Sequence, residues 1–237
     1  MTRPLAPLLA LAVALTAATS GAEPLKILPI GDSLTKGTGS THRAGYRLEF
    51  LARMKAAGVD VDMVGSFHDG PTEIDRDHQG HQGQGVAKLD EVSFDEMRRE
   101  RPGAVILMIG TNDAKERSLV PEAFRIRYSV LLDRILAESK TKLLAATIPP
   151  ARFGRRGKVI VAINNIIRSE VAKRVSAGKA VVLVDVYALL DNRADFVDNL
   201  HMNDAGYAKV GDAFADALLE MLDQPAAAAA VVGDGVK

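Results

Sequence analysis

The sequence contains no cysteine and no tryptophan, and only 5% of its 237 residues are aromatic. The absence of cysteine excludes disulfide bonds, a thiol nucleophile and thiolate metal ligands. Thirty basic and thirty acidic residues give a formal net charge of zero, so no overall field would hold the chain on nucleic acid or on an anionic membrane. These absences indicate a small or neutral partner and a core stabilised by apolar packing.

The length and the hydrophobic content of 47% predict one folded domain with a single sizeable core, over residues 23–223. The tail over residues 224–237 is dominated by alanine and lacks capping or strand signals, so we expect it to be disordered. No internal repeat is visible.

The first 22 residues have the pattern of a secretory signal. A basic residue, Arg3, precedes an apolar run over 5–18, and small residues end at Ala22. The pattern predicts a signal peptide over 1–22, cleaved after Ala22, and an exported protein in the periplasm or outside the cell. An uncleaved anchor is the alternative, but the apolar run is shorter than the roughly 20 residues that a spanning helix needs. We therefore expect no stable membrane insertion.

Short apolar runs rich in β-branched residues alternate with segments of helical periodicity. The expected strands are Lys26–Ile30, Val59–Val64, Ala104–Ile109, Lys142–Thr147 and Ala180–Val184. The expected helices are Arg43–Ala57, Val86–Arg99, Pro121–Ser139, Lys158–Ala177 and Ala205–Leu222. This alternation predicts an α/β fold, a doubly wound three-layer α/β/α sandwich with a five-stranded parallel sheet.

Two distant fragments carry the residue types of a catalytic triad. Ser33 lies in "IGDSLTKG", and Asp198 and His201 lie in "VDNLHMNDAGY". A serine hydroxyl needs a base to accept its proton and a carboxylate to orient that base, and His201 and Asp198 fit these roles. Taken alone, the first fragment is equally consistent with a capped strand-to-helix turn, and the second with a solvated loop before a helix. Their joint occurrence favours nucleophilic catalysis.

Candidate oxyanion donors lie between these fragments. Gly83 in "GHQGQG" would allow a backbone N–H to approach a developing negative charge, and Asn112 in "GTND" could add a side-chain N–H. The backbone of Ser33 would be a third donor. A flexible loop around Gly83 and a turn at Asn112 are the structural alternatives.

With these blocks in place, the sequence resembles the SGNH, or GDSL, hydrolase superfamily, whose fold is flavodoxin-like. The four blocks correspond to Ser33, Gly83, Asn112 and His201, and Asp198 completes the triad. The stretches "VDMVGS" and "DHQGHQG" look most like those of family 3 carbohydrate esterases, which include acetylxylan esterases. The resemblance implies an acetylesterase that removes acetyl groups from sugar hydroxyls without an organic cofactor. The second glycine of the α/β-hydrolase nucleophile elbow is missing, so that motif is excluded.

One departure bears on the substrate. Those esterases usually carry a tryptophan after the second-block glycine, where this chain has Gln84. Aromatic faces are the usual platform for sugar rings, so a short acetylated saccharide or another small ester is the expected substrate. The alternatives are a lysophospholipase or thioesterase acting on longer acyl chains, and a non-catalytic carbohydrate-binding module on a hydrolase scaffold.

A cluster of histidines and carboxylates before Gly83 could also be interpreted as a metal site. It contains Asp75, Asp77, His78 and His81. Because no further ligand pair stands out, we expect these side chains to support the loop beside the oxyanion donors, and we expect no metal.

Overall fold

The computed structural model describes residues 23–115, 121–137, 140–151, 156–191 and 193–223. The predicted signal peptide and the alanine-rich tail lie outside these ranges. Among the residues described, no helix combines the length and the apolar character needed to span a membrane.

A central parallel sheet confirms the predicted fold class. All five predicted strands form, with ends that differ from the predicted ones by up to two residues, in the spatial order β2-β1-β5-β6-β7. Their bounds are β1 (Leu25–Gly31), β2 (Val61–Met63), β5 (Ala104–Met108), β6 (Lys142–Ala146) and β7 (Val181–Val184). Strand β5 is buried along its whole length, as its continuous apolar run predicts.

The sheet also contains two strands that the sequence analysis missed, so the prediction of five strands was too low. Strand β4 (Asp77–Gly80) pairs in parallel with the end of β1, and β3 (Phe67–His68) pairs antiparallel with β4. Three of the four residues in β4 are polar, yet His78 and Gln79 are buried. A polar buried strand gives no apolar signal, which is why the sequence indicated only a loop.

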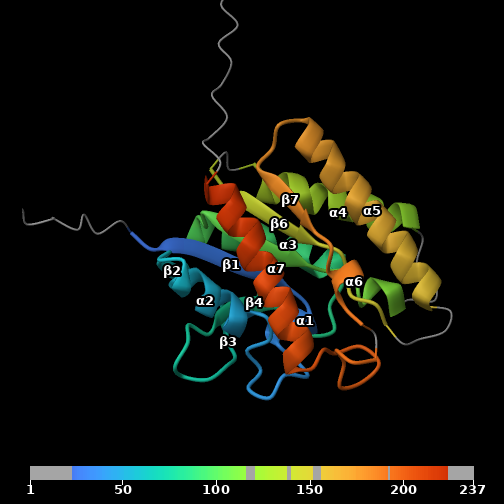
Figure 1. Ribbon diagram of the computed structural model, residues 1–237. Coiled ribbons are helices and arrows are strands. Elements are labelled where there is room, and N and C mark those ends of the chain that lie inside the picture. The colour runs from blue at the N-terminus through green and yellow to red at the C-terminus, as the bar shows by residue number, and fades with distance from the viewer. Residues whose placement is uncertain (1–22, 116–120, 138–139, 152–155, 192, 224–237) are drawn as a thin grey trace, which may run out of the picture.

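Helices cover both faces of the sheet (Figure 1). Helices α2 and α7 pack together on one face, and α3, α4 and α5 on the other. Side chains alternate accordingly along β1. Ile27 packs in the core on the side of α2 and α7, and Leu28 packs in the core on the side of α3, α4 and α5. The helix bounds are α1 (Ser33–Lys36), α2 (Arg47–Ala56), α3 (Val86–Glu100), α4 (Pro121–Ile135), α5 (Arg156–Ser176), α6 (Val186–Leu189) and α7 (Asp204–Asp223), with a 3₁₀ turn η1 (Asp113–Lys115).

Helix α2 begins four residues later than its periodicity predicts. Arg43 and Gly45 have left-handed backbone conformations, with φ of 55° and 58°, which a right-handed helix cannot contain. The guanidinium of Arg47 is fully buried and donates to the carbonyl oxygens of Arg43, Asp69 and Arg76 at 3.2, 2.7 and 2.9 Å. Burying this charge fixes the preceding loop, so helix α2 begins only at Arg47.

Three strand ends lie in register at one edge of the sheet. Gly31 of β1 is paired with Gly80 of β4 on one side and with Met108 of β5 on the other. The segments that follow these strands carry Ser33, Gly83 and Asn112 respectively. The topology therefore brings three distant parts of the chain to the carboxyl edge of the sheet, where ligands bind in open α/β folds.

Candidate active site

Ser33 is the first residue of α1 and follows β1 after a single residue. Asp32 caps this short helix, because its carboxylate accepts from the backbone N–H of Leu34 at 2.9 Å. Glycine is required at position 31, since a Cβ there would collide with Thr35 Oγ1 and the Met108 carbonyl oxygen. The tight packing leaves Ser33 only 4% exposed and fixes its position above the sheet.

Ser33, His201 and Asp198 form a chain of hydrogen bonds. The hydroxyl Oγ of Ser33 lies 3.1 Å from Nε2 of His201, although the two residues are 168 positions apart. On the other side of the ring, His201 Nδ1 lies 2.8 Å from Asp198 Oδ2. The structure therefore brings together the three side chains that the sequence nominated as a triad.

The carboxylate of Asp198 is held by the backbone as well as by the histidine. Its Oδ1 accepts from the N–H groups of Leu200 and His201, each at 2.6 Å. Partial burial of the carboxyl opposes ionisation, but the hydrogen bonds from His201 and from these amides outweigh it and lower the pKa of Asp198. Asp198 is thus an oriented carboxylate anion beside the ring.

The segment that carries His201 is fixed at both ends. Phe196 and Met202 form an isolated antiparallel bridge, and Val197 N–H donates to the His201 carbonyl oxygen at 3.0 Å. Asn203 then starts α7, because its Oδ1 accepts from the N–H of Gly206 at 2.9 Å. This tight turn places Asp198 and His201, three residues apart, side by side.

The amide side chain of Asn112 is held on three sides. Its Nδ2 donates to the Gln84 carbonyl oxygen at 2.9 Å and to Asp32 Oδ2 at 3.3 Å. Its Oδ1 accepts from Nζ of Lys115 at 2.9 Å. The amide nitrogen is therefore turned toward Asp32, the residue next to Ser33.

Gly83 lies in the loop between β4 and α3. The loop is anchored at its start, where His81 N–H donates to the Gly31 carbonyl oxygen at 2.8 Å, and at its end, where Val86 N–H donates to the carboxylate of Asp113. Gly83 itself has a left-handed φ of 77°, and no atom lies within 4 Å of where its Cβ would be. The glycine is thus required by backbone conformation and faces open space.

Asp32, the cap of α1, is also a fully buried carboxyl group next to Ser33. Burial raises its pKa to about 7, although the hydrogen bond from Leu34 N–H and the positive charge of Lys115 act in the opposite direction. Asp32 and Asn112 together link the end of β1 to the segment after β5.

The four side chains considered as metal ligands have separate partners. His78 is fully buried; its Nδ1 accepts from Gly80 N–H at 2.9 Å and its Nε2 lies 3.2 Å from Asp69 Oδ2. Asp75 accepts from the N–H of Met63, and Asp77 bonds to His68. His81 packs edge-on against the ring of Phe67.

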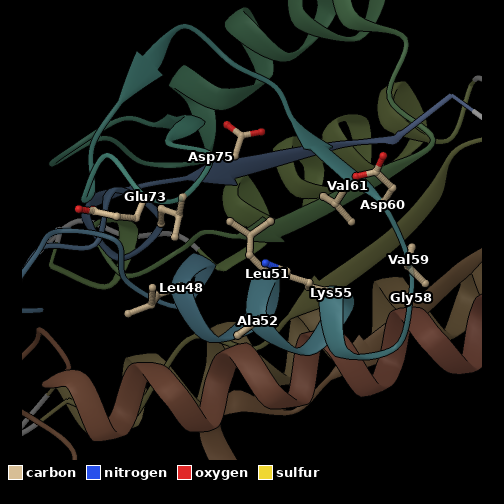
Figure 2. Close-up of a pocket in the computed structure, with 11 residues that line it drawn as sticks. Leu48, Leu51, Ala52, Lys55, Gly58, Val59, Asp60, Val61, Glu73 and Asp75 are labelled. Carbon is tan, nitrogen blue, oxygen red and sulfur yellow. The ribbon is translucent and has the colours of Figure 1, made fainter.

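A cavity of about 520 Å³ lies away from these residues, between α2, β2 and the segment 73–75 (Figure 2). Its lining includes the apolar side chains Leu51 and Val61 and the acidic side chains Asp60 and Glu73. None of the five candidate site residues lines it. This cavity is therefore separate from the candidate site at the carboxyl edge of the sheet.

Known proteins share the fold and part of the sequence of this chain. A family 3 carbohydrate esterase from Clostridium thermocellum is 29% identical, with a TM-score of 0.76 over 84% of this chain and 98% of that one. A family 3 carbohydrate esterase from Talaromyces cellulolyticus shares the fold at 24% identity, with a TM-score of 0.73 over 85% of this chain and all of that one. A multidomain esterase of Ruminococcus flavefaciens is 28% identical over 222 residues, which is 81% of this chain. The match spans only 28% of that relative's length.

A family match covers the part of the chain that holds the site. Residues 30–209 match the GDSL-like lipase/acylhydrolase family, and all five candidate residues fall within this stretch. The resemblance inferred from the sequence blocks is confirmed, and the chain belongs to the GDSL-like lipase/acylhydrolase family of ester hydrolases.

Proposed function

We propose that this chain is a serine esterase that hydrolyses small carboxylic esters, with O-acetyl groups on short carbohydrates as its substrates. The observation that carries the proposal is the hydrogen-bond chain from Ser33 through His201 to Asp198 at the carboxyl edge of the sheet. Membership of an acylhydrolase family and the likeness to family 3 carbohydrate esterases support the same chemistry.

In the first step, Ser33 Oγ attacks the carbonyl carbon of the ester while Nε2 of His201 accepts the hydroxyl proton. For this transfer Nε2 must carry a free lone pair, so the ring proton must sit on Nδ1. The 2.8 Å contact from Nδ1 to the Asp198 carboxylate favours that tautomer and stabilises the imidazolium that forms.

The negative charge that develops on the carbonyl oxygen would be met by three donors: the N–H of Ser33, the N–H of Gly83 and Nδ2 of Asn112. Nδ2 has two hydrogens, and its contact to Asp32, at 3.3 Å, is longer than its contact to Gln84. We infer that the hydrogen of Nδ2 that now points to Asp32 is donated to the oxyanion during the reaction. The open space around Gly83 leaves room for the substrate carbonyl.

Collapse of the tetrahedral intermediate breaks the ester C–O bond, and the imidazolium of His201 gives its proton to the departing alcohol oxygen. The acyl group remains on Ser33 Oγ. Water then attacks this acyl-enzyme, with His201 again accepting a proton, and the carboxylic acid leaves as Ser33 regains its hydrogen. Asp198 stays ionised throughout.

The proposed substrate class follows from the shortage of aromatic residues. The sequence has no tryptophan, and Gln84 stands where the related esterases usually carry one. A long polysaccharide would lack stacking surfaces on which to bind, whereas a short acetylated saccharide needs only the acyl-binding groups and a few polar contacts.

The test is hydrolysis of p-nitrophenyl esters from acetate to palmitate, with acetylated xylo-oligosaccharides in parallel. We expect turnover confined to acetate and other short esters, together with release of acetate from the oligosaccharides. Ser33→Ala should lower kcat by at least about a thousand-fold, because it removes the nucleophile and leaves only the oxyanion donors and substrate binding to assist the reaction.

The matched control is Ser169→Ala, which removes a serine hydroxyl from α5 and should leave kcat unchanged. A preference for long acyl chains would replace the acetylesterase proposal with lipid or thioester chemistry. Ester hydrolysis that survives in a folded Ser33→Ala variant would refute the mechanism.

A further inference from the structure

The orientation of the Asn112 amide matters because its two ends have opposite roles. Rotation by 180° would exchange the donor Nδ2 for the acceptor Oδ1, and an acceptor facing an oxyanion would repel it. The neighbours of the amide therefore decide whether it can assist the reaction. In this structure those neighbours are Gln84, Asp32 and Lys115.

Two of these neighbours can each bond to only one end of the amide. The Gln84 carbonyl oxygen can only accept, so it bonds to Nδ2, and Lys115 bonds to the opposite end. An ammonium group has donors and no acceptor, so it can bond to Oδ1 and never to Nδ2. The carboxyl of Asp32 is less selective, because burial raises its pKa to about 7 and a protonated carboxyl can also donate. The 2.9 Å contact from Lys115 Nζ thus holds the Oδ1 end, as the Gln84 carbonyl oxygen holds the Nδ2 end, whatever the protonation of Asp32.

The local backbone brings the lysine to this position. Lys115 ends the turn η1, in which Ala114 N–H donates to the Gly110 carbonyl oxygen and Lys115 N–H to that of Asn112, each at 3.0 Å. One tight turn therefore returns the side chain to the amide three residues earlier. The positive charge of Lys115 also acts on the buried carboxyl of Asp32 beside Ser33.

We propose that Lys115 is a positioning residue for ester hydrolysis: its ammonium holds Asn112 with Nδ2 toward the oxyanion and strengthens that N–H as a donor. Hydrogen bonding of a cation to an amide oxygen draws electron density from the amide nitrogen, which makes its N–H a better donor. This inference rests on the proposed function, because it needs an oxyanion at the site.

The effect should be confined to the transition state, where the negative charge exists. With p-nitrophenyl acetate, we expect Lys115→Met to lower kcat about tenfold and to change KM by less than about twofold. Lys115→Arg keeps a cationic donor and should restore most of the activity. The matched control is Lys88→Met, which removes an exposed lysine of α3 that pairs with Glu91.

A double-mutant cycle tests whether Lys115 acts through Asn112. In an Asn112→Ala background, Lys115→Met should change kcat by less than about twofold, because there is no amide left to orient. An equal loss in both backgrounds, or no loss in the single variant, would overturn the inference. Thermal unfolding of each variant establishes that the fold is retained, and Lys115→Ala, which also lacks a donor, replaces Lys115→Met if the latter does not fold.

The same assay separates failure of this inference from failure of the proposed function. If wild-type turnover depends on Ser33 and Lys115→Met retains the wild-type kcat, only the role of Lys115 is wrong. If wild-type turnover does not depend on Ser33, the proposed function fails and the role of Lys115 fails with it.

Discussion

Among the single residues, His78 is a buried histidine whose two ring nitrogens both form hydrogen bonds within the protein. Nδ1 accepts from Gly80 N–H, so Nε2 carries the ring hydrogen and donates to Asp69. Burial, together with the positive charge of Arg47, lowers the pKa of His78 to about 3. His78 therefore remains neutral at physiological pH and holds the end of β4, from which the Gly83 loop departs.

This histidine should make the protein less stable in mild acid. The unfolded chain binds a proton at position 78 as the pH falls through about 6.5, whereas the folded chain does not. His78 should therefore lower the free energy of unfolding by about 2 kcal/mol between pH 8 and pH 5. His78→Gln should lack this loss, because a glutamine amide can bond to both partners without titrating. Urea unfolding followed by circular dichroism at the two pH values measures the difference.

The wild-type protein alone would not isolate the effect of His78, because Asp32 changes the free energy of unfolding with pH in the opposite direction. Its pKa rises from 3.8 to about 7 on folding, so its contribution to stability decreases as the pH rises through that range. Asp32 is present in both proteins, and its effect cancels in the comparison. His42→Gln, at an exposed histidine, is the matched control. An equal loss of stability in wild type and His78→Gln would contradict the buried neutral histidine.

Among the structural elements, the loop after α1 and the segment before α7 are packed against each other at Gly39. A Cβ at this position would lie 2.5 Å from the Met202 carbonyl oxygen and 2.8 Å from Cβ of His201. Gly39 also has a left-handed φ of 100°. The contact links the segment after Ser33 directly to the segment that carries His201.

Gly39→Ala should therefore impair activity as well as stability. The added methyl must push the two segments apart, and a shift of about 1 Å in the base can reduce turnover about a hundred-fold. We expect kcat for p-nitrophenyl acetate to fall by at least about tenfold. Gly58→Ala is the matched control, because Gly58 also has a left-handed φ, of 74°, but faces open space. Equal kcat values in the two variants would show that the contact does not position His201.

Elements with regular apolar patterns could be predicted from the sequence, and those defined by polar contacts could not. Strand β5 was evident because all of its residues are apolar and buried. Strand β4 was missed because its burial depends on His78 and on partners in other segments. Helix α2 was extended too far because periodicity does not report the left-handed backbone at Arg43 and Gly45.

The same distinction applies to the candidate site. Ser33, Asp198 and His201 were nominated from residue types in two short fragments, and the fold brings them within hydrogen-bonding distance. Lys115 was not nominated, because its contact with Asn112 depends on the turn η1, and the sequence did not predict that turn. The sequence therefore indicated the chemical groups, whereas their supporting contacts needed the structure.

In the molecule as a whole, one sheet separates two apolar cores and provides the edge on which the site is built. The core with α2 and α7 contains Phe214, and the core with α3, α4 and α5 contains Leu131, both fully buried. Both cores contact β1, whose last residue is paired with β4 and β5 just before Ser33. Packing on both faces of the sheet thus fixes the strand ends that carry Ser33, the proposed nucleophile, and the loops of the proposed oxyanion donors.

The central claim, that Ser33 is an activated nucleophile, is tested most directly by covalent labelling with a serine-directed phosphonate, followed by mass mapping of the labelled peptides. The account predicts one phosphonate per chain, attached to Ser33, with labelling abolished in Ser33→Ala and strongly slowed in His201→Ala. Failure of the folded wild-type protein to react, or attachment at a different serine, would contradict it.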